Sequence, residues 1–86
     1  MKLRKEFITQ NIDGEQIMVS TGDSGFCGLV RNNASAAFIV DCLKEHTTRE
    51  EIVIAMLKEY DASPEIIEES VSNILNKLRE IGALDE

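Results

Sequence analysis

The first third of the chain alternates between apolar and polar residues, which predicts short β-strands. Residues 5–12 ("KEFITQNI") and 16–20 ("QIMVS") form two such runs, and Asp13–Gly14 lies between them. An Asp-Gly pair in that position strongly indicates a hairpin. Residues 21–25 ("TGDSG") predict a second turn, because they tolerate unusual backbone angles. A third strand over 25–32 ("GFCGLVRN") would complete an antiparallel three-stranded sheet.

The third strand is unusual because it contains glycine. Glycine weakens a strand and often marks a place where another backbone approaches closely. Period-two alternation divides the strand into two faces, with Phe26, Gly28 and Val30 on one and Cys27, Leu29 and Arg31 on the other. We expect Val30 to face the helices.

After residue 32 the pattern changes to helical spacing, and two helix starts can be identified. Asn33 can cap a helix over 34–45, and Thr48 with Glu51 has the spacing of a capping box that starts a helix over 49–60. The expected buried positions are Ala36, Ala37, Ile39, Val40 and Leu43 in the first helix, and Ile52, Ala55, Met56 and Leu57 in the second.

A third helix is predicted from Ser63 as N-cap, with Pro64 at the first helical position, to about Ile81, where Gly82 ends it. One apolar stripe follows this helix, formed by Ile67, Val71, Ile74, Leu78 and Ile81 and widened by Ile66 and Leu75. The pattern predicts a single domain over residues 1–86. Its fold class is α+β and winged-helix-like, with a three-stranded antiparallel sheet followed by three helices (βββααα).

Composition and charge narrow the classes of function. The chain has 86 residues, 43% of them apolar, and a net charge of −7. A domain of this size has little room for a deep catalytic pocket, and its acidic balance is unfavourable for nucleic-acid binding. No apolar run resembles a signal peptide or a membrane span. We therefore expect a cytoplasmic protein, not bound to a membrane, whose two cysteines are reduced thiols.

Candidate chemistry is sparse. His46 is the only histidine and falls near a helix end, while Cys27 and Cys42 lack the close spacing of zinc ligands. The glycines at 22, 25 and 28 do not form a phosphate-binding GxGxxG before a helix. We expect no catalytic residues, no metal site and no cofactor.

Four segments resemble a known family in their order and spacing: "DGEQIMV" (13–19), "GLVRNNASAAFIVDCL" (28–43), "TTREEIVIAMLKEYDAS" (47–63) and "VSNILNKLREIGAL" (71–84). Together they resemble the PqqD-like family of RiPP recognition elements. These are the peptide chaperone of pyrroloquinoline quinone biosynthesis and its relatives, which bind leader peptides of ribosomally made, modified peptides. The chain departs from the family pattern at Asn32, where Leu is usual, at Ser35, where Thr is usual, and at Val40, where many members have an aromatic residue.

The resemblance implies a site and a function. In the family the leader peptide adds as a strand to the edge of the third strand, in a groove beside the third helix, which is β-augmentation. The implied peptide-binding residues are Phe26, Cys27, Gly28, Leu29, Val30 and Arg31 on the strand, and Ile67, Val71, Ile74, Leu75 and Leu78 on the helix. Such a domain presents the leader to a modifying enzyme, often a radical SAM protein, and performs no chemistry itself.

Three alternatives remain at the level of sequence. A winged-helix DNA-binding regulator is disfavoured by the acidic balance, since the third helix carries only Lys77 and Arg79 as cations. A small subunit that only stabilises a partner enzyme would fit the same composition. An independent enzyme has no supporting group of residues. An open strand edge would also allow a homodimer that competes with the leader.

Overall fold

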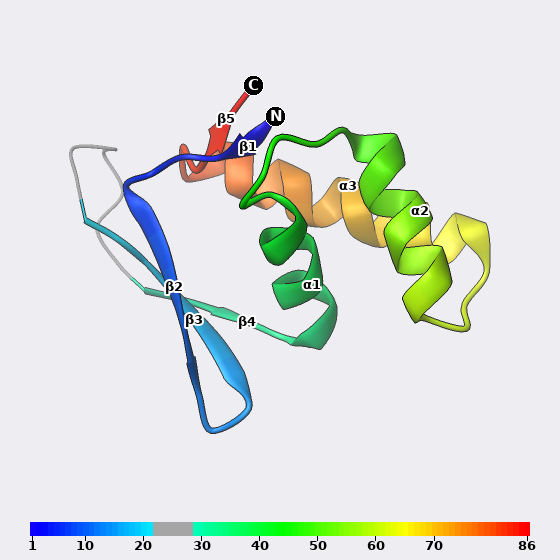
Figure 1. Cartoon of the computed structure of the whole chain (residues 1–86), viewed down its shortest axis with the longest axis horizontal. Helices are drawn as coiled ribbons and strands as arrows, with labels where there is room; N and C mark the ends of the chain where they lie inside the picture. The colour runs from blue at the N-terminus through cyan, green and yellow to red at the C-terminus, as the bar shows by residue number, and fades with distance from the viewer. Residues whose placement is uncertain (22–28) are drawn as a thin grey trace.

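A three-stranded antiparallel sheet forms one side of the molecule. The computed structural model describes residues 1–21 and 29–86. The strands are β2 (Phe7–Ile12), β3 (Glu15–Ser20) and β4 (Leu29–Asn32), in the order β2-β3-β4 (Figure 1). The predicted hairpin is confirmed, with Asp13 and Gly14 at φ 51° and 81° in the turn. The first residues predicted for the third strand, like most of the second turn, lie outside the described residues.

Three helices follow the sheet, so the predicted α+β fold is confirmed: α1 (Ala34–Cys42), α2 (Arg49–Glu59) and α3 (Pro64–Glu80). Each begins at the predicted cap, whose side chain accepts a hydrogen bond from the backbone N–H three residues on: Asn33, Thr48 and Ser63. The first helix ends at Cys42, before the predicted residue 45. The chain turns away there because the carbonyl of Leu43 accepts a hydrogen bond from the N–H of Leu3 (2.8 Å).

Helix α3 ends as predicted at a glycine. Gly82 has φ 74°, a conformation that strongly favours glycine. Its N–H donates to the carbonyl of Arg79 (3.1 Å), and the N–H of Ala83 donates to the carbonyl of Leu78 (2.8 Å). These two bonds form a Schellman motif, which satisfies the last carbonyls of the helix and reverses the chain.

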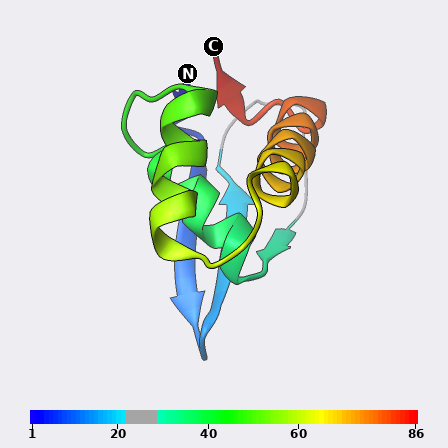
Figure 2. The ribbon, with the colours of Figure 1, turned by 90° about the vertical axis from the view of Figure 1, so that its right-hand side faces the viewer.

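The two ends of the chain pair with each other, which the sequence analysis did not predict. Strand β1 (Lys2–Leu3) runs antiparallel to β5 (Leu84–Asp85). The N–H of Arg4 also donates to the carbonyl of Ala83 (2.8 Å). The termini therefore lie side by side, at the end of the molecule away from the β2–β3 turn (Figures 1 and 2).

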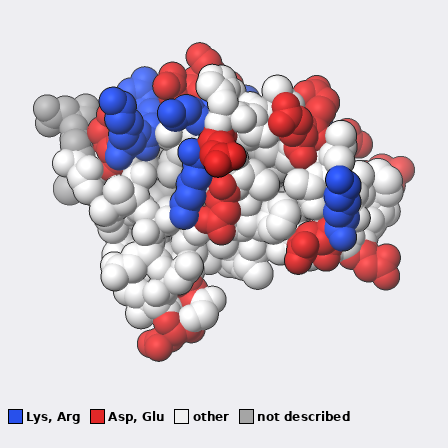
Figure 3. All heavy atoms as spheres, in the orientation of Figure 1, with Lys and Arg blue, Asp and Glu red and all other residues white. Residues whose placement is uncertain are grey.

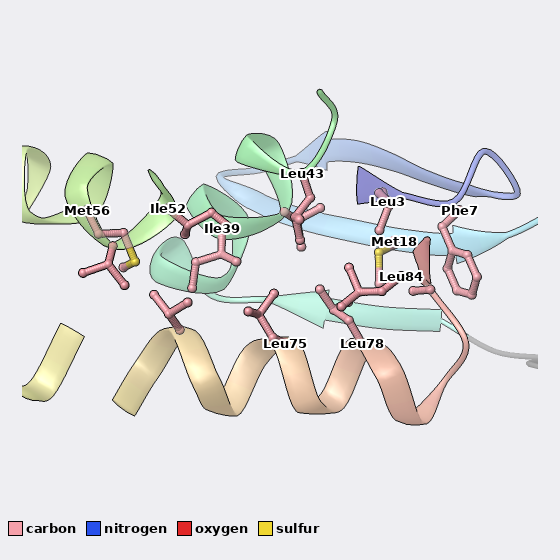
Figure 4. Packing of buried hydrophobic residues seen from close by; sticks show 14 of the residues in the cluster. Leu3, Phe7, Met18, Ile39, Leu43, Ile52, Met56, Leu75, Leu78 and Leu84 are labelled. Atoms are coloured by element: carbon pink, nitrogen blue, oxygen red, sulfur yellow. The ribbon is translucent and has the colours of Figure 1, made fainter. Parts of the chain in front are cut away.

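The hydrophobic core lies between the sheet and the helices, with α1 in contact with β3, β4, α2 and α3 (Figure 4). Its fully buried members include Met18, Ile39, Val40, Leu43, Ile52, Met56, Val71 and Leu75. Three expected buried positions are corrected, because Leu57 is 38% exposed and Ala37 and Ala55 are half-buried. Ile66, which widens the apolar stripe on α3, is 59% exposed. Val53 is buried in place of Leu57. At about 100° per residue, Leu57 lies about 140° around the helix from Ile52, beyond the buried face.

Candidate functional site

Strand β4 is an edge strand in the part of the chain that the structure describes. It pairs with β3 on one side, in a register that places Val30 opposite Met18 and Asn32 opposite Gln16. No described strand pairs with its other side. Unpaired backbone groups on such an edge are a template for another extended chain.

The sheet register identifies the backbone groups that face the open edge. The N–H of Thr21 donates to the carbonyl of Glu6 (2.6 Å), so these two residues are a hydrogen-bonded pair. Hydrogen-bonded and non-bonded pairs alternate along an antiparallel ladder. The backbone N–H and C=O groups of the even-numbered residues of β3 therefore bond to β4. Those of the even-numbered residues of β4 bond to β3 in return. The N–H and C=O groups of Leu29 and Arg31 consequently point to the open edge.

The side chains of β4 alternate as predicted. Val30 faces inward and packs against the core, and Asn32 is buried, whereas Leu29 and Arg31 are exposed on the opposite face. The guanidinium of Arg31 lies 3.5 Å from the carboxylate of Glu15 on β3, and both side chains are more than half exposed. This ion pair contributes little to stability at such exposure.

A groove runs between β4 and the C-terminal half of α3. Its volume is about 350 Å³, and it is lined by Val30, Arg31 and Asn32 from the strand and by Ile74, Lys77, Leu78, Glu80 and Ile81 from the helix. Ile74 and Ile81 are half-buried at the margin of the core, so they present apolar surface to the groove. Figure 4 shows Leu75 and Leu78 pointing from α3 toward β4. The open backbone edge and the apolar groove thus lie along the same strand.

A chain of polar side chains lies beneath the groove. The Nδ2 of Asn32 donates to Oε1 of Gln16 (2.7 Å), and Nε2 of Gln16 donates to Oδ1 of Asp41 on α1 (3.0 Å). The same carboxylate oxygen is 3.1 Å from Nζ of Lys44. The departure at Asn32 is therefore accommodated by a polar partner on β3, and this chain of bonds ties β4 to β3 and α1.

The structure separates the predicted site residues into four groups. Val30, Arg31, Ile74 and Leu78 line the groove. Ile67, Val71 and Leu75 are buried in the core, and Leu29 contributes its backbone to the edge while its side chain faces away. Phe26, Cys27 and Gly28 lie outside the described residues. Sequence reasoning did not place four lining residues in the site: Asn32, Lys77, Glu80 and Ile81. Ile81 belongs to the predicted stripe on α3, and Lys77 and Glu80 flank it.

A second hollow, of about 250 Å³, gathers basic residues near the termini: Lys2, Arg4, Lys5 and Lys44, with Leu3 and Phe7. We call this surface the basic hollow. Figure 3 shows Lys and Arg side chains gathered at this end of the molecule, on the face that it presents. The basic run at the start of the chain is therefore joined by Lys44, which follows α1.

Cys42 and His46, the described residues that the sequence offers as candidate chemistry, do not line the groove. The described residues contain no cluster of three or more His, Cys, Asp or Glu side chains that could hold a metal ion. Burial raises the pKa of the Cys42 thiol, and the neighbouring Asp41 raises it further, so the reactive thiolate is disfavoured. His46 Nδ1 lies 3.3 Å from the N-terminal amine, away from the groove. No helix within residues 1–21 and 29–86 has the length and apolar character needed to cross a membrane.

Known proteins resemble this chain in sequence and in fold. The family described as "Coenzyme PQQ synthesis protein D (PqqD)" matches residues 15–84. The solved structure of TbiB1 in complex with the TbiA(beta) leader peptide has a TM-score of 0.82 and 25% sequence identity, over 99% of this chain and 95% of that one. A lasso peptide synthetase B1 complexed with the leader peptide has a TM-score of 0.77 and 22% sequence identity, over 95% of this chain and 93% of that one, which is a likeness of fold. No curated protein matches the chain.

Proposed function

Because this chain belongs to the PqqD family, we propose that it is an adaptor that binds the leader of a ribosomally made precursor peptide. The leader adds as a strand to the open edge of β4, and its side chains enter the groove beside α3. The observation that carries this proposal is the coincidence of the edge and the groove, since the strand with unpaired backbone groups also forms one wall of the apolar hollow.

The backbone of β4 supplies affinity that depends little on peptide sequence. Leu29 and Arg31 each offer one N–H and one C=O, spaced two residues apart, as an incoming strand requires. Alternate side chains of that strand would face α3, where Ile74, Leu78 and Ile81 provide apolar contacts. This division is the general logic of β-augmentation, in which main-chain bonds give affinity and pockets give specificity.

The predicted site residues that do not line the groove have other roles in this proposal. Ile67, Val71 and Leu75 hold α3 against the core and thereby fix the helical wall. Phe26, Cys27 and Gly28 would extend the docking edge beyond Leu29. Support for peptide binding comes from TbiB1, a protein of similar fold whose structure contains a leader peptide.

We further propose that the chain performs no chemistry and presents the bound leader to a modifying enzyme, of the radical SAM class in our interpretation, in the cytoplasm. The described residues that line the groove include no nucleophile or general base other than the exposed Glu80 carboxylate and Lys77 amine. The alternative of a DNA-binding regulator has no support in the comparisons.

The proposal is tested by backbone amide NMR of the labelled protein. The added peptide is the synthetic leader region of a precursor peptide sought among the short open reading frames beside its own gene. We expect saturable shifts at 29–32 and 74–81. Shifts confined to the β1–β5 end or to α2, or the absence of any shift at millimolar peptide, would contradict it.

A further inference from the structure

Asn32 is the one polar side chain among the inward-facing described residues of β4. It is 8% exposed, yet it lines the groove. Val30, the other inward-facing residue of the described strand, is apolar. An amide buried at this depth has a high desolvation cost unless its donors and acceptors find partners.

The hydrogen bonds beneath the groove fix the orientation of this amide. The carboxylate of Asp41 only accepts, so the group that Gln16 turns toward it is its NH₂ (3.0 Å). Gln16 must then turn its carbonyl oxygen to Asn32, whose NH₂ donates to it (2.7 Å). The carboxylate thus sets the direction of both amides, and Asn32 cannot flip without placing two acceptors against each other.

The orientation leaves Oδ1 of Asn32 available. Among the residues that the structure describes, this oxygen accepts no hydrogen bond, and it is not among their fully enclosed atoms that lack a partner. It therefore retains some access to solvent, and the residue that carries it lines the groove. Asn32 thus brings an acceptor of fixed orientation to this wall.

We propose that Asn32 determines specificity by accepting a hydrogen bond from a neutral donor side chain of the bound peptide, a hydroxyl or a carboxamide. This inference rests on the proposed function and names the side chain taken at one position of the leader strand. An aliphatic side chain at that position would cover Oδ1 without a partner, and a carboxylate would place an acceptor against it. Gln16 does not line the groove and acts as the positioning residue that holds the amide of Asn32.

The first experiment selects peptides from a displayed library of random 12-residue sequences on the immobilised full-length protein. Selection is repeated on three variants. Gln16→Met/Asn32→Leu replaces both amides together, which avoids an orphaned partner. Gln16→Met keeps Asn32 but releases its orientation. Gln10→Met is the matched control, an exposed amide on β2 that faces the other side of the sheet. Circular dichroism verifies that each variant folds.

We expect wild type and Gln10→Met to enrich Ser, Thr, Asn or Gln at one shared position. The double variant should enrich aliphatic residues there with the other positions unchanged. The Gln16→Met protein should no longer distinguish a hydrogen-bond donor from an acceptor at that position of the peptide. An aliphatic preference at every position in the wild type, or the same preference in the double variant, would overturn the inference.

The second experiment measures the bond itself. The strongest selected peptide is synthesised with Thr, and again with Val, at the shared position. Replacing Thr by Val should weaken binding to wild type about three- to tenfold, the contribution of one net hydrogen bond. It should leave binding to the double variant unchanged or stronger. Equal losses for both proteins would overturn the inference.

The two experiments separate this inference from the proposed function. If the library yields no peptide whose binding perturbs the amides of 29–32, the proposed function itself has failed. If peptides bind at those residues but their preference does not depend on Asn32, only the inference has failed.

Discussion

At the scale of the residue, Asn32 stands where the family pattern usually has Leu. Its pairing with buried Gln16 shows how a polar side chain can be accommodated at the core. Gln16 is 3% exposed and Asn32 is 8% exposed, and each has its partner on a neighbouring element. Replacing one member of such a pair leaves the other without a partner, which costs more than replacing both. The loss of stability on substitution therefore depends on the pair and not on either residue alone.

This pairing predicts a non-additive effect on stability. Asn32→Leu should lower the free energy of unfolding by about 1–3 kcal/mol, because Oε1 of Gln16 loses its donor while buried. Adding Gln16→Met should recover most of that loss. Urea unfolding followed by circular dichroism measures both. A double variant less stable than the single one would contradict the argument.

Cys42 gives a prediction about pH. Burial raises the pKa of its thiol and the adjacent carboxylate of Asp41 raises it further, so folding disfavours the thiolate. In a Cys27→Ser background, alkylation of Cys42 by iodoacetamide near pH 8 should be several-fold slower in the folded protein than in urea. Because the pKa is higher in the folded state, the unfolded chain loses its proton first. The thiol therefore lowers stability as pH rises above its unfolded pKa of about 8.5.

Mass spectrometry of the alkylated protein checks the prediction. Asp41→Asn should partly restore the rate, since it removes the second cause and leaves the first. Equal rates for folded and unfolded protein would show that burial does not control this thiol.

At the scale of the element, sequence patterns predicted most of what local chemistry determines. The hairpin and the three helix caps are set by residues within a few positions of each other, and all are found. The end of α1 and the β1–β5 pair were not predicted, because both depend on contacts between distant parts of the chain. Strands of two residues also leave no periodicity to detect.

The same distinction between local patterns and distant contacts applies to the residues of the candidate site. The resemblance and the pattern of β4 indicated the strand wall, and spacing on α3 indicated its apolar side. Spacing alone cannot separate residues that face the core from those one step around the helix. Val71 and Leu75 are therefore buried, while Lys77 and Ile81 line the groove. Only the packing of α3 against β4 and α1 decides between them.

The open edge of β4 gives a prediction about backbone groups. Leu29→Pro removes one N–H that faces the edge, so peptide binding should weaken at least about threefold, since one main-chain hydrogen bond is lost. Asn11→Pro is the control, because the same alternation points its N–H to the outer edge of β2, away from the groove. Fluorescence anisotropy with a labelled leader peptide measures both. Equal affinity of the two folded variants would contradict β-augmentation at this edge.

The end of α3 gives a prediction about the chain reversal. Gly82→Ala places a Cβ at φ 74° and should lower the free energy of unfolding by about 1–2 kcal/mol. Gly82→Asn should cost less, because Asn tolerates this conformation better. Thermal unfolding ranks the variants, and the order wild type, Asn, Ala is expected. Loss of equal size for Asn and Ala would indicate that Gly82 is needed for space instead.

At the scale of the whole molecule, the distribution of charge predicts different behaviour for a partner bound in the groove and for one bound by cations. The chain carries 16 acidic and 9 basic residues. On α3 the guanidinium of Arg79 is held by the carboxylate of Glu86 at 3.0–3.2 Å, and Lys77 lies at the groove. The basic hollow is the described surface that concentrates cations, and it lies beside β1, apart from the groove. A partner held by the groove and one held by charge would therefore respond differently to salt.

The last prediction uses that difference. Peptide binding through main-chain bonds and apolar contacts should change less than about threefold between 50 and 500 mM NaCl, because exposed charges contribute little to it. Binding to a 20-base-pair duplex through the four cations of the basic hollow would fall by about three to four orders of magnitude over the same range. We expect no duplex binding at 150 mM NaCl, and Lys2→Ala/Lys5→Ala should leave peptide affinity unchanged. Duplex binding that persists at this salt, and that the double variant abolishes, would favour the DNA-binding alternative over a leader-peptide adaptor.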